Sequence, residues 1–343
     1  MVKGKTKRVL ITGATGQDGS YLAEFLVNKG YKVFGLVRRS SNDPFVRFNG
    51  RPNVKNRVEF IYGNLRDEAS LGRALDRARP DEIYNLAAQT DVGVSFTCPE
   101  ETMEVNYFGL GRLVNEAMKR NPAIRIFQAS TSEMFGKTPP PQSERSPFQP
   151  VSPYGESKLK AHEDFVVGYR ERHGLYIVSG ISFNHESPRR GEHFVTRKIA
   201  ISLSKVKLGL QDSFALGNLD TKRDWGFAGD YVEAMWLMLQ RKKPEDFVIA
   251  TGVSHTVRDF VEAAGRHLGF DIVWRGRGLK EVGIDKKSGR EIVRVDRRFY
   301  RPHEVYNLRG DSRKARRLLH WKPRVSFEGL VKMMVDADYR LAS

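Results

Sequence analysis

The sequence predicts an α/β fold, in which a doubly wound parallel sheet is followed by a smaller C-terminal lobe. Three observations predict it. Short apolar runs alternate with helical patterns in the first half of the 343-residue chain, a glycine-rich turn follows the first apolar run, and the alternation ends after residue 184. Alternating strands and helices form a parallel sheet, because each helix carries the chain back across the sheet to start the next strand in the same direction.

Six apolar runs in the first half have the length and composition of buried strands. They cover residues 8–11, 31–37, 58–62, 82–86, 125–129 and 175–182. Helical patterns lie between them, at residues 17–29, 68–79, 101–120 and 154–173. The first helix is predicted to end at Gly30, since glycine commonly follows the last residue of a helix.

The pattern changes in the second half of the chain. Residues 194–208 and 231–240 indicate helices, residues 217–229 a loop, and the glycine- and charge-rich residues 276–289 an exposed loop. Residues 247–250 form a short apolar strand that would return the chain to the sheet. The prediction is a sheet domain over residues 1–183 with a returning segment at about 228–254, and a lobe made mainly of residues 184–227 and 255–343.

Composition narrows the class of protein. Hydrophobic residues make up 40% of the chain, which excludes global disorder. No apolar run approaches the roughly 20 residues that a membrane helix needs. Residues 1–7 form a short basic leader without the apolar stretch of a secretory signal. The single cysteine, Cys98, precedes Pro99 and is interpreted as a packing residue of a cytoplasmic protein.

The chain is strongly basic, with a formal net charge of +17 and a pI of about 9.9. Lysine and arginine cluster between residues 275 and 324. Such a balance is compatible with nucleic-acid binding, but no helix-turn-helix, RNP, zinc or other metal-ligand signature accompanies it. We therefore favour a solvated basic face, or an electropositive approach for a polyanionic small molecule, and expect no nucleic acid, membrane or metal partner.

A glycine-rich turn follows the first predicted strand and opens the first helix. Gly13, Gly16 and Gly19 make the pattern G-x-x-G-x-x-G. Glycines let the backbone approach a pyrophosphate, and the helix N-terminus offers unpaired N–H groups to it. The pattern predicts dinucleotide binding on a Rossmann sheet; the turn also includes Thr15, Gln17 and Asp18.

The end of the second strand indicates which dinucleotide binds. An NAD site would place an acidic residue there for the ribose hydroxyls, but this chain has Arg38, Arg39, Ser40 and Ser41. Arginine suits a 2′-phosphate, which favours NADP. The ends of the third and fourth strands are expected beside the adenine and the nicotinamide ribose, and they carry Asn64, Leu65, Leu86, Ala88 and Gln89.

Tyr154 and Lys158 are four residues apart, and therefore share a helix face. A free tyrosine has a pKa near 10. A lysine and an oxidised nicotinamide would each stabilise the phenolate, so that Tyr154 could take a proton from a sugar hydroxyl. Thr131, past the fifth strand, could bond the same substrate oxygen.

Glu133 lies two residues beyond Thr131 and adds a carboxylate that a plain dehydrogenase does not need. It could remove a C–H proton made acidic by a neighbouring ketone, and then protonate a departing hydroxyl. A carboxylate that merely caps the following segment is the alternative.

With these residues, the chain resembles the extended short-chain dehydrogenase/reductase family and, within it, the GDP-mannose dehydratase branch. The resemblance covers nearly the whole chain. Its most specific stretches are residues 11–22 (ITGATGQDGSYL), 38–41 (RRSS), 128–136 (QASTSEMFG), 152–158 (SPYGESK), 183–191 (FNHESPRRG), 194–199 (FVTRKI), 216–225 (LGNLDTKRDW) and 230–239 (DYVEAMWLML).

The resemblance implies a hydro-lyase that converts GDP-mannose to GDP-4-keto-6-deoxy-mannose, with tightly bound NADP that ends unchanged. It implies that Tyr154 and Glu133 act at C4 and at C5/C6 of the sugar. It also implies that the lobe binds the nucleotide sugar. The residues implied at the substrate are Asn184, Val195, Lys198, Arg223, Arg301 and Glu304, and those implied at the cofactor are His185 and Arg190.

Alternatives remain at this point. A related nucleotide-sugar epimerase or reductase, or a bifunctional dehydratase-reductase, would use the same fold. A dinucleotide-sensing or nucleic-acid-binding protein would explain the positive charge. The resemblance implies a homodimer through residues 101–120 and 154–173, or a homotetramer through the loop at residues 42–52, which departs from the family pattern.

Overall fold

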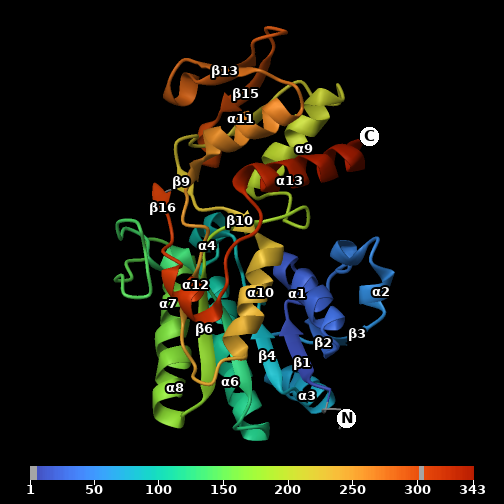
Figure 1. The fold of residues 1–343 in the computed structure, drawn as a ribbon, viewed down its shortest axis with the longest axis vertical. Helices are drawn as coiled ribbons and strands as arrows, with labels where there is room; N and C mark the ends of the chain where they lie inside the picture. Colours follow the sequence, from blue (N-terminus) through green and yellow to red (C-terminus); the bar gives the residue numbers. More distant parts are fainter. Residues whose placement is uncertain (1–5, 301–304) are drawn as a thin grey trace.

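The computed structural model describes residues 6–300 and 305–343, and its largest unit is a seven-stranded sheet (Figure 1). The strand order is β11-β6-β5-β4-β1-β2-β3, and every neighbouring pair is parallel. The predicted doubly wound parallel sheet is therefore confirmed. Its strands are β1 (Arg8–Thr12), β2 (Lys32–Val37), β3 (Val58–Tyr62), β4 (Glu82–Asn85), β5 (Arg125–Thr131), β6 (Tyr176–Ser182) and β11 (Phe247–Ile249).

Helices cover both faces of this sheet because its strands are apolar on both sides. Val9 and Ile11 of β1 pack toward one face, against α1 (Gln17–Asn28), α10 (Ala228–Leu239) and α12 (Arg313–Leu319). Leu10 packs toward the other face, against α3 (Glu68–Ala78) and α6 (Gly109–Arg120). The alternation along one strand thus builds two separate cores.

Two long helical segments were predicted correctly but contain a wider turn. Residues 99–120 comprise α5 (Pro99–Met103), the π-helical η2 (Glu104–Phe108) and α6. Residues 153–173 comprise α7 (Pro153–Ala161), the π-helical η4 (His162–Val167) and α8 (Gly168–His173). The short helices η1 (Val46–Phe48), α2 (Pro52–Lys55) and α4 (Val92–Thr97) lie in the loops after β2 and β4.

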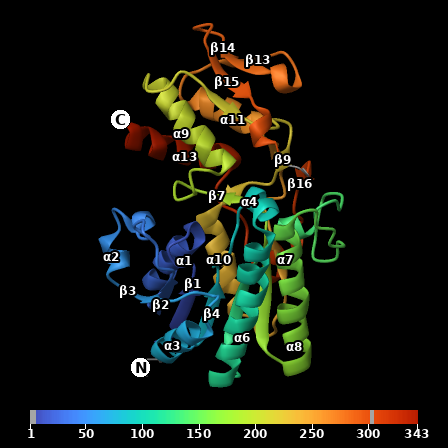
Figure 2. The same ribbon diagram turned by 180° about the vertical axis from the view of Figure 1, so that it is seen from behind.

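A second group of elements lies beyond one end of the sheet, as both views of the chain show (Figures 1 and 2). Here α9 (Val195–Lys207), α11 (Val257–His267) and α13 (Phe327–Ala342) pack around a third core. A four-stranded sheet joins them, in the order β13 (Ile272–Arg275), β14 (Val282–Asp285), β15 (Glu291–Val295) and β8 (Phe214–Leu216).

Two loop predictions were wrong. Residues 276–289 contain β14, which pairs antiparallel with β13 and β15. Residues 217–229 contain β9 (Lys222–Arg223), β10 (Gly226–Phe227) and the first two residues of α10. β14 was missed because its charged, glycine-rich segment has the composition of a loop, although it pairs with the neighbouring strands β13 and β15. β9 and β10 were missed because they are only two residues long and pair with segments far away in the sequence.

Pairs of short strands connect the sheet and its helices with the second group of elements. β7 (His185–Glu186) pairs with β10, and β9 pairs with both β12 (His255–Thr256) and β16 (Asn307–Leu308). β11 returns to the sheet beside β6, and α12 packs against β11. The exact residue boundaries of the two domains stay a prediction. In the described part of the chain, no helix combines the length and the apolar character that crossing a membrane requires.

Candidate active site

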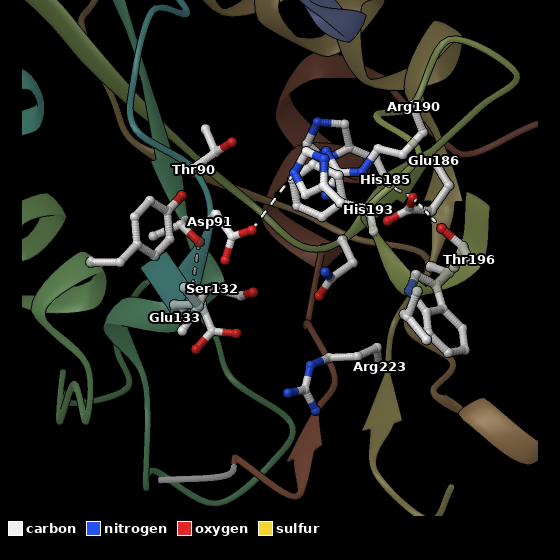
Figure 3. A pocket seen from close by; sticks show the side chains of 18 of the residues that line it. Thr90, Asp91, Ser132, Glu133, His185, Glu186, Arg190, His193, Thr196 and Arg223 are labelled. Carbon is white, nitrogen blue, oxygen red and sulfur yellow. Dashed lines mark hydrogen bonds and ion pairs between the residues drawn. The ribbon is translucent and has the colours of Figure 1, made fainter. Parts of the chain in front are cut away.

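A cavity of about 790 Å³ opens where the carboxyl ends of β4, β5 and β6 face the second group of elements. Its walls come from both groups, so residues far apart in the sequence meet there (Figure 3). The predicted site residues in its lining are Asp18, Leu86, Ala88, Thr131, Glu133, Tyr154, Lys158, Asn184, His185, Arg190, Val195, Lys198 and Arg223.

The helix α7 presents Tyr154 and Lys158 to the cavity. Ser152 caps this helix by accepting a hydrogen bond from the backbone N–H of Gly155 at 3.1 Å. Both site side chains are buried, and Lys158 Nζ donates to the carbonyl oxygen of Ala129 at 2.9 Å. The cap and this contact fix the tyrosine and the lysine against the end of β5.

The protonation behaviour of this pair differs from our expectation. Burial raises the pKa of Tyr154 to about 12, although a hydrogen bond with Thr131 opposes the rise. Burial lowers the pKa of Lys158 to about 8. The phenol is therefore a weaker acid than free tyrosine because burial disfavours the phenolate. The Lys158 ammonium group bonds a carbonyl oxygen rather than the phenol.

The end of β5 supplies the other two predicted catalytic side chains. Thr131 Oγ1 accepts a hydrogen bond from the backbone N–H of Glu133 at 3.2 Å and caps η3 (Ser132–Met134). The Thr131 hydroxyl also acts to lower the pKa of Tyr154. Glu133 is buried, and its carboxyl group faces the same open space as Arg223 (Figure 3). A phenol and a carboxyl group thus lie within one cavity, where both can exchange protons with a bound molecule.

His185 and Asp18 connect the segment after β6 with the start of α1. The His185 Nε2 lies 2.8 Å from Asp18 Oδ2, and its Nδ1 lies 2.7 Å from the carbonyl oxygen of Phe183. The imidazole stacks on the ring of Tyr231 with 4.6 Å between ring centroids. Burial would lower the pKa of His185, but Asp18 reverses this and the pKa lies above its ordinary value.

Arg190 lies on the loop that follows β7. Its Nε is 3.1 Å from Glu186 Oε2, and its guanidinium lies 3.5 Å from the centroid of the Phe194 ring. Glu186 also accepts a hydrogen bond from Thr196 at 2.6 Å. These contacts direct the Arg190 side chain into the cavity (Figure 3).

The second group of elements contributes basic side chains. Lys198 Nζ lies 3.3 Å from the centroid of the Phe299 ring, and burial lowers the pKa of its ammonium group. Arg223 is buried and donates to the carbonyl oxygen of Val305 at 2.6 Å. Asn184 and Val195 also line the cavity. The other two predicted substrate residues, Arg301 and Glu304, lie outside the described residues.

The glycine turn has the geometry that its spacing predicts. Gly13 has a φ of +65°, and a Cβ there would lie 2.8 Å from the backbone nitrogen of Ala87. A Cβ on Gly19 would lie 2.2 Å from the carbonyl oxygen of Gly13. Gly16 begins α1 without a side-chain cap. The turn is thus packed tightly against its neighbours, while N–H groups of the first helical turn stay available to an anion.

Several predicted cofactor residues lie outside the cavity lining. Residues 38–41 are exposed at the end of β2. Leu65 is buried in the core between α3 and α6. The Gln89 side chain donates to the carbonyl oxygen of Asp91 at 2.9 Å and to Thr102 at 3.0 Å. The full set outside the lining is Gly13, Thr15, Gly16, Gln17, Gly19, Arg38, Arg39, Ser40, Ser41, Asn64, Leu65 and Gln89.

Sequence reasoning missed some residues of the cavity. Asp91 and His193 approach each other across it, with 3.7 Å between Oδ2 and Nε2 (Figure 3). Asp91 follows β4, and this position was a usable signal because strand carboxyl ends carry such sites. His193 and the segment 298–300 carry no local motif that would have identified them.

The fold and the position of Tyr154 and Lys158 on α7 are those of a short-chain dehydrogenase/reductase. Comparison with known proteins narrows the class. The sequence model described as "GDP-mannose 4,6 dehydratase" matches residues 10–334. The chain belongs to the GDP-mannose 4,6-dehydratase family.

Relatives of this family are similar over nearly their whole length. "GDP-mannose 4,6 dehydratase 1" of Arabidopsis thaliana is 52% identical, over 98% of this chain and 91% of the relative. The human GDP-mannose 4,6 dehydratase is 51% identical, over 98% and 93%. The enzyme of Vibrio cholerae is 46% identical, over 98% and 95%.

Solved structures share the fold at lower identity. The UDP-glucose 4-epimerase of Thermus thermophilus, in complex with NAD, has a TM-score of 0.78 at 27% identity, over 98% of this chain and 100% of that one. The UDP-glucose 4-epimerase of Thermotoga maritima has a TM-score of 0.80 at 23% identity, over 98% and 99%.

Proposed function

We propose that this protein dehydrates GDP-mannose to GDP-4-keto-6-deoxy-mannose with a tightly held NADP. The observation that carries the proposal is the meeting of Thr131, Glu133, Tyr154 and Lys158 in one cavity. The chain has about half its residues in common with enzymes named for this reaction. A dehydrogenase needs a proton acceptor such as Tyr154 and a positive charge such as Lys158. Elimination of water needs a carboxyl group in addition, which Glu133 provides.

The residues present fit a nicotinamide dinucleotide. The uncapped start of α1 and the glycine turn supply N–H groups and close backbone approach for a pyrophosphate. Arg38 and Arg39 are exposed beside this turn, and neither guanidinium has a hydrogen-bond or ion-pair partner within residues 6–300 and 305–343. A 2′-phosphate would give them one, which supports NADP over NAD.

A nicotinamide dinucleotide held by the glycine turn and by residues 38–41 would supply the acceptor for a hydride from C4 of the hexose and the donor of that hydride to C6. In this reaction Tyr154 accepts the proton of the C4 hydroxyl, and Thr131 holds the same oxygen through its hydroxyl group. Lys158 supplies positive charge beside the phenol. Because burial raises the pKa of Tyr154 to about 12, the charge of Lys158 and of the oxidised cofactor must together favour the phenolate.

Glu133 performs the elimination. The ketone at C4 makes the C5 proton acidic, and the Glu133 carboxylate removes it. The same carboxyl group then protonates the C6 hydroxyl, which leaves as water. When the hydride is returned to C6, C5 takes up the proton that Tyr154 had accepted, so that Tyr154 and Glu133 both end in their starting states. Lys198 and Arg223 line the cavity on the opposite side and bind the diphosphate of the nucleotide sugar.

Product mass tests this function. The purified protein is incubated with GDP-mannose, and the product is expected to weigh one water less than the substrate. An unchanged mass would indicate a nucleotide-sugar epimerase instead. NADP released from the denatured protein, at about one molecule per chain, identifies the cofactor.

The oligomeric state and the cellular location are also part of the proposed function. We infer a homo-oligomer, as the resemblance implies, and a cytoplasmic location, which the single cysteine Cys98 favours. The exposed Phe108 lies within the helical segment 99–120 of the expected dimer face.

A further inference from the structure

Arg47 connects the two loops that the proposed cofactor site depends on. Its Nε donates to the carbonyl oxygen of Arg189 at 2.7 Å, and its Nη1 donates to the carbonyl oxygen of Thr15 at 3.2 Å. Thr15 belongs to the glycine turn. Arg189 belongs to the loop at residues 187–191, which also carries Arg190. One guanidinium group therefore ties together two segments that are far apart in the sequence.

The backbone around Arg47 is anchored by aromatic side chains. Arg47 lies in η1, and both Phe45 and Phe48 pack on Phe60 of β3 in edge-to-face contacts, with centroid distances of 4.8 and 5.4 Å. Phe48 is fully buried. The arginine is thus projected from a fixed base toward the two loops, rather than from a loose surface segment.

The loop at residues 187–191 is held by guanidinium groups at three successive carbonyl oxygens. Arg47 binds the middle one, and Arg197 donates to the carbonyl oxygens of Pro188 and Arg190. Arg197 in turn forms a buried ion pair with Asp338 of α13, with hydrogen bonds of 2.7 and 2.8 Å from Nε. The backbone that carries Arg190 is therefore fixed from two sides.

Side chains also dock this loop along α1. Arg189 lies 3.8 Å from the ring centroid of Tyr21 and donates to the hydroxyl of Ser20 at 3.3 Å. Ser187 donates to the Gln17 side chain at 2.8 Å. These contacts hold the loop to the body of the helix, whereas Arg47 holds it to the glycine turn that precedes the helix. Arg47 therefore holds the loop at the glycine turn, which is where a pyrophosphate would lie.

Charge at this place also favours an anion. Burial lowers the pKa of Arg47, and the neighbouring Arg190 and Arg197 act in the same direction. Asp18 is the acidic group that opposes them. Guanidinium groups that repel one another are stabilised when an anionic ligand comes between them.

We propose that Arg47 is a positioning residue for the dinucleotide: by holding the glycine turn and the loop at residues 187–191 in one arrangement, it sets how long NADP stays bound. This inference rests on the proposed function, because it assumes that the dinucleotide lies between these loops. The planar fork of arginine is essential here, since it reaches two carbonyl oxygens at once.

The test compares three variants of the full-length protein. Arg47→Met removes both donors, and Arg47→Lys keeps the charge but not the fork. Arg51→Met is the matched control, since Arg51 lies in the same loop, is 38% exposed and is 3.7 Å from Glu24. The rate at which NADPH leaves the protein is measured by fluorescence on dilution, and hydrogen exchange reports on residues 13–16 and 187–191.

Both Arg47 variants are expected to release NADPH at least about tenfold faster than the unchanged protein, since a contact worth about 1.4 kcal/mol changes a binding constant tenfold. Hydrogen exchange should rise in both loops, and the KM for added NADP should rise more than kcat falls. The Arg51→Met protein should behave like the unchanged protein.

Unchanged NADPH release from the Arg47→Met protein would overturn the proposal. So would full recovery in the Arg47→Lys protein, because charge alone would then explain the effect. If the Arg47→Met protein does not fold, the rate of NADPH release from the Arg47→Lys protein still tests the proposal. If the unchanged protein binds no nicotinamide dinucleotide, the proposed function fails together with this inference; if it binds NADP and only the Arg47 comparison fails, the proposed function stands.

Discussion

The imidazole Nε2 of His185 lies 2.8 Å from the carboxylate Oδ2 of Asp18, while its Nδ1 lies 2.7 Å from the carbonyl oxygen of Phe183. A carboxylate and a carbonyl oxygen can only accept hydrogen bonds, so both ring nitrogens must carry a proton. The side chain is therefore an imidazolium, and its stacking on Tyr231 adds a cation–π contact. A fixed ion pair thus lines the cavity next to the glycine turn.

This relationship predicts a His185 that remains charged at neutral pH. The folded-state pKa of His185 is raised, so its contribution to stability is complete below the unfolded value of about 6.5 and is lost as the pH rises through the folded value. The pKa of Asp18 is lowered, so its contribution is lost only as the pH falls through that lowered value. Nitrogen NMR of the histidine ring at neutral pH should show two protonated nitrogens; a single one would contradict the assignment.

Asp18→Asn should reverse the shift in His185. The substitution removes the carboxylate but keeps the shape, so only the Phe183 carbonyl group would still oppose burial, and the pKa of the imidazole should fall. A cost of about 1.5–3 kcal/mol in the free energy of unfolding is expected for losing a buried, charged hydrogen bond. Chemical denaturation at neutral pH measures it, and a cost that persists unchanged at high pH would argue against a charge effect.

Lys158→Met should stabilise the protein and abolish its activity. Burial lowers the pKa of Lys158 to about 8, so between that pH and about 10.4 the unfolded chain binds more protons than the folded one, and stability rises with pH. Below this range the buried charge costs about 3 kcal/mol, of which the lost bond to Ala129 offsets part. The contribution of residue 158 to the free energy of unfolding should therefore be the same at pH 7 and pH 10 in the methionine variant. In the unchanged protein it should be larger at pH 10, as denaturation at both pH values measures.

Glu133→Gln should separate oxidation from elimination. Tyr154 and Thr131 remain, so C4 oxidation can proceed, but no carboxyl group can take the C5 proton or protonate the leaving hydroxyl. A loss of about 10²–10⁴-fold in water elimination is typical of removing a general acid or base. Reduced nicotinamide should accumulate on the protein when GDP-mannose is added. Full dehydration by this variant would remove Glu133 from its proposed role.

Arg38→Ala should change the choice of cofactor. The guanidinium is exposed without a protein partner in the described part of the chain, so its removal costs the fold little. A charge-assisted bond to a 2′-phosphate should be lost, which weakens NADP by about tenfold or more while NAD is hardly affected. Titration of the cofactor-free protein with both dinucleotides measures the ratio. Equal weakening of both would mean that Arg38 does not read the phosphate.

The sheet was predictable from the sequence because its signals are local. Each strand of the first half contains a short apolar stretch between helical patterns, and such a stretch can be recognised without knowledge of its partner strand. The glycine turn and the Tyr154–Lys158 pair were predictable for the same reason, since spacing alone places their side chains.

β14 escaped prediction because its composition is misleading: it pairs with the neighbouring strands β13 and β15, but its charged, glycine-rich segment has the composition of a loop. The other features that escaped prediction depend on contacts between distant segments. The Lys158 ammonium group lies on the Ala129 carbonyl, a contact that exists only once α7 packs against β5. Arg47 shows no motif at all, because its two carbonyl partners come together only in the folded chain.

The central claim is that hydrogen removed from C4 of the sugar is returned to C6 within one site. The most direct measurement uses GDP-mannose labelled with deuterium at C4, without added cofactor. We expect a product that weighs one water less and carries the deuterium at C6. Deuterium that is lost to the solvent, or that remains at C4, would contradict the claim.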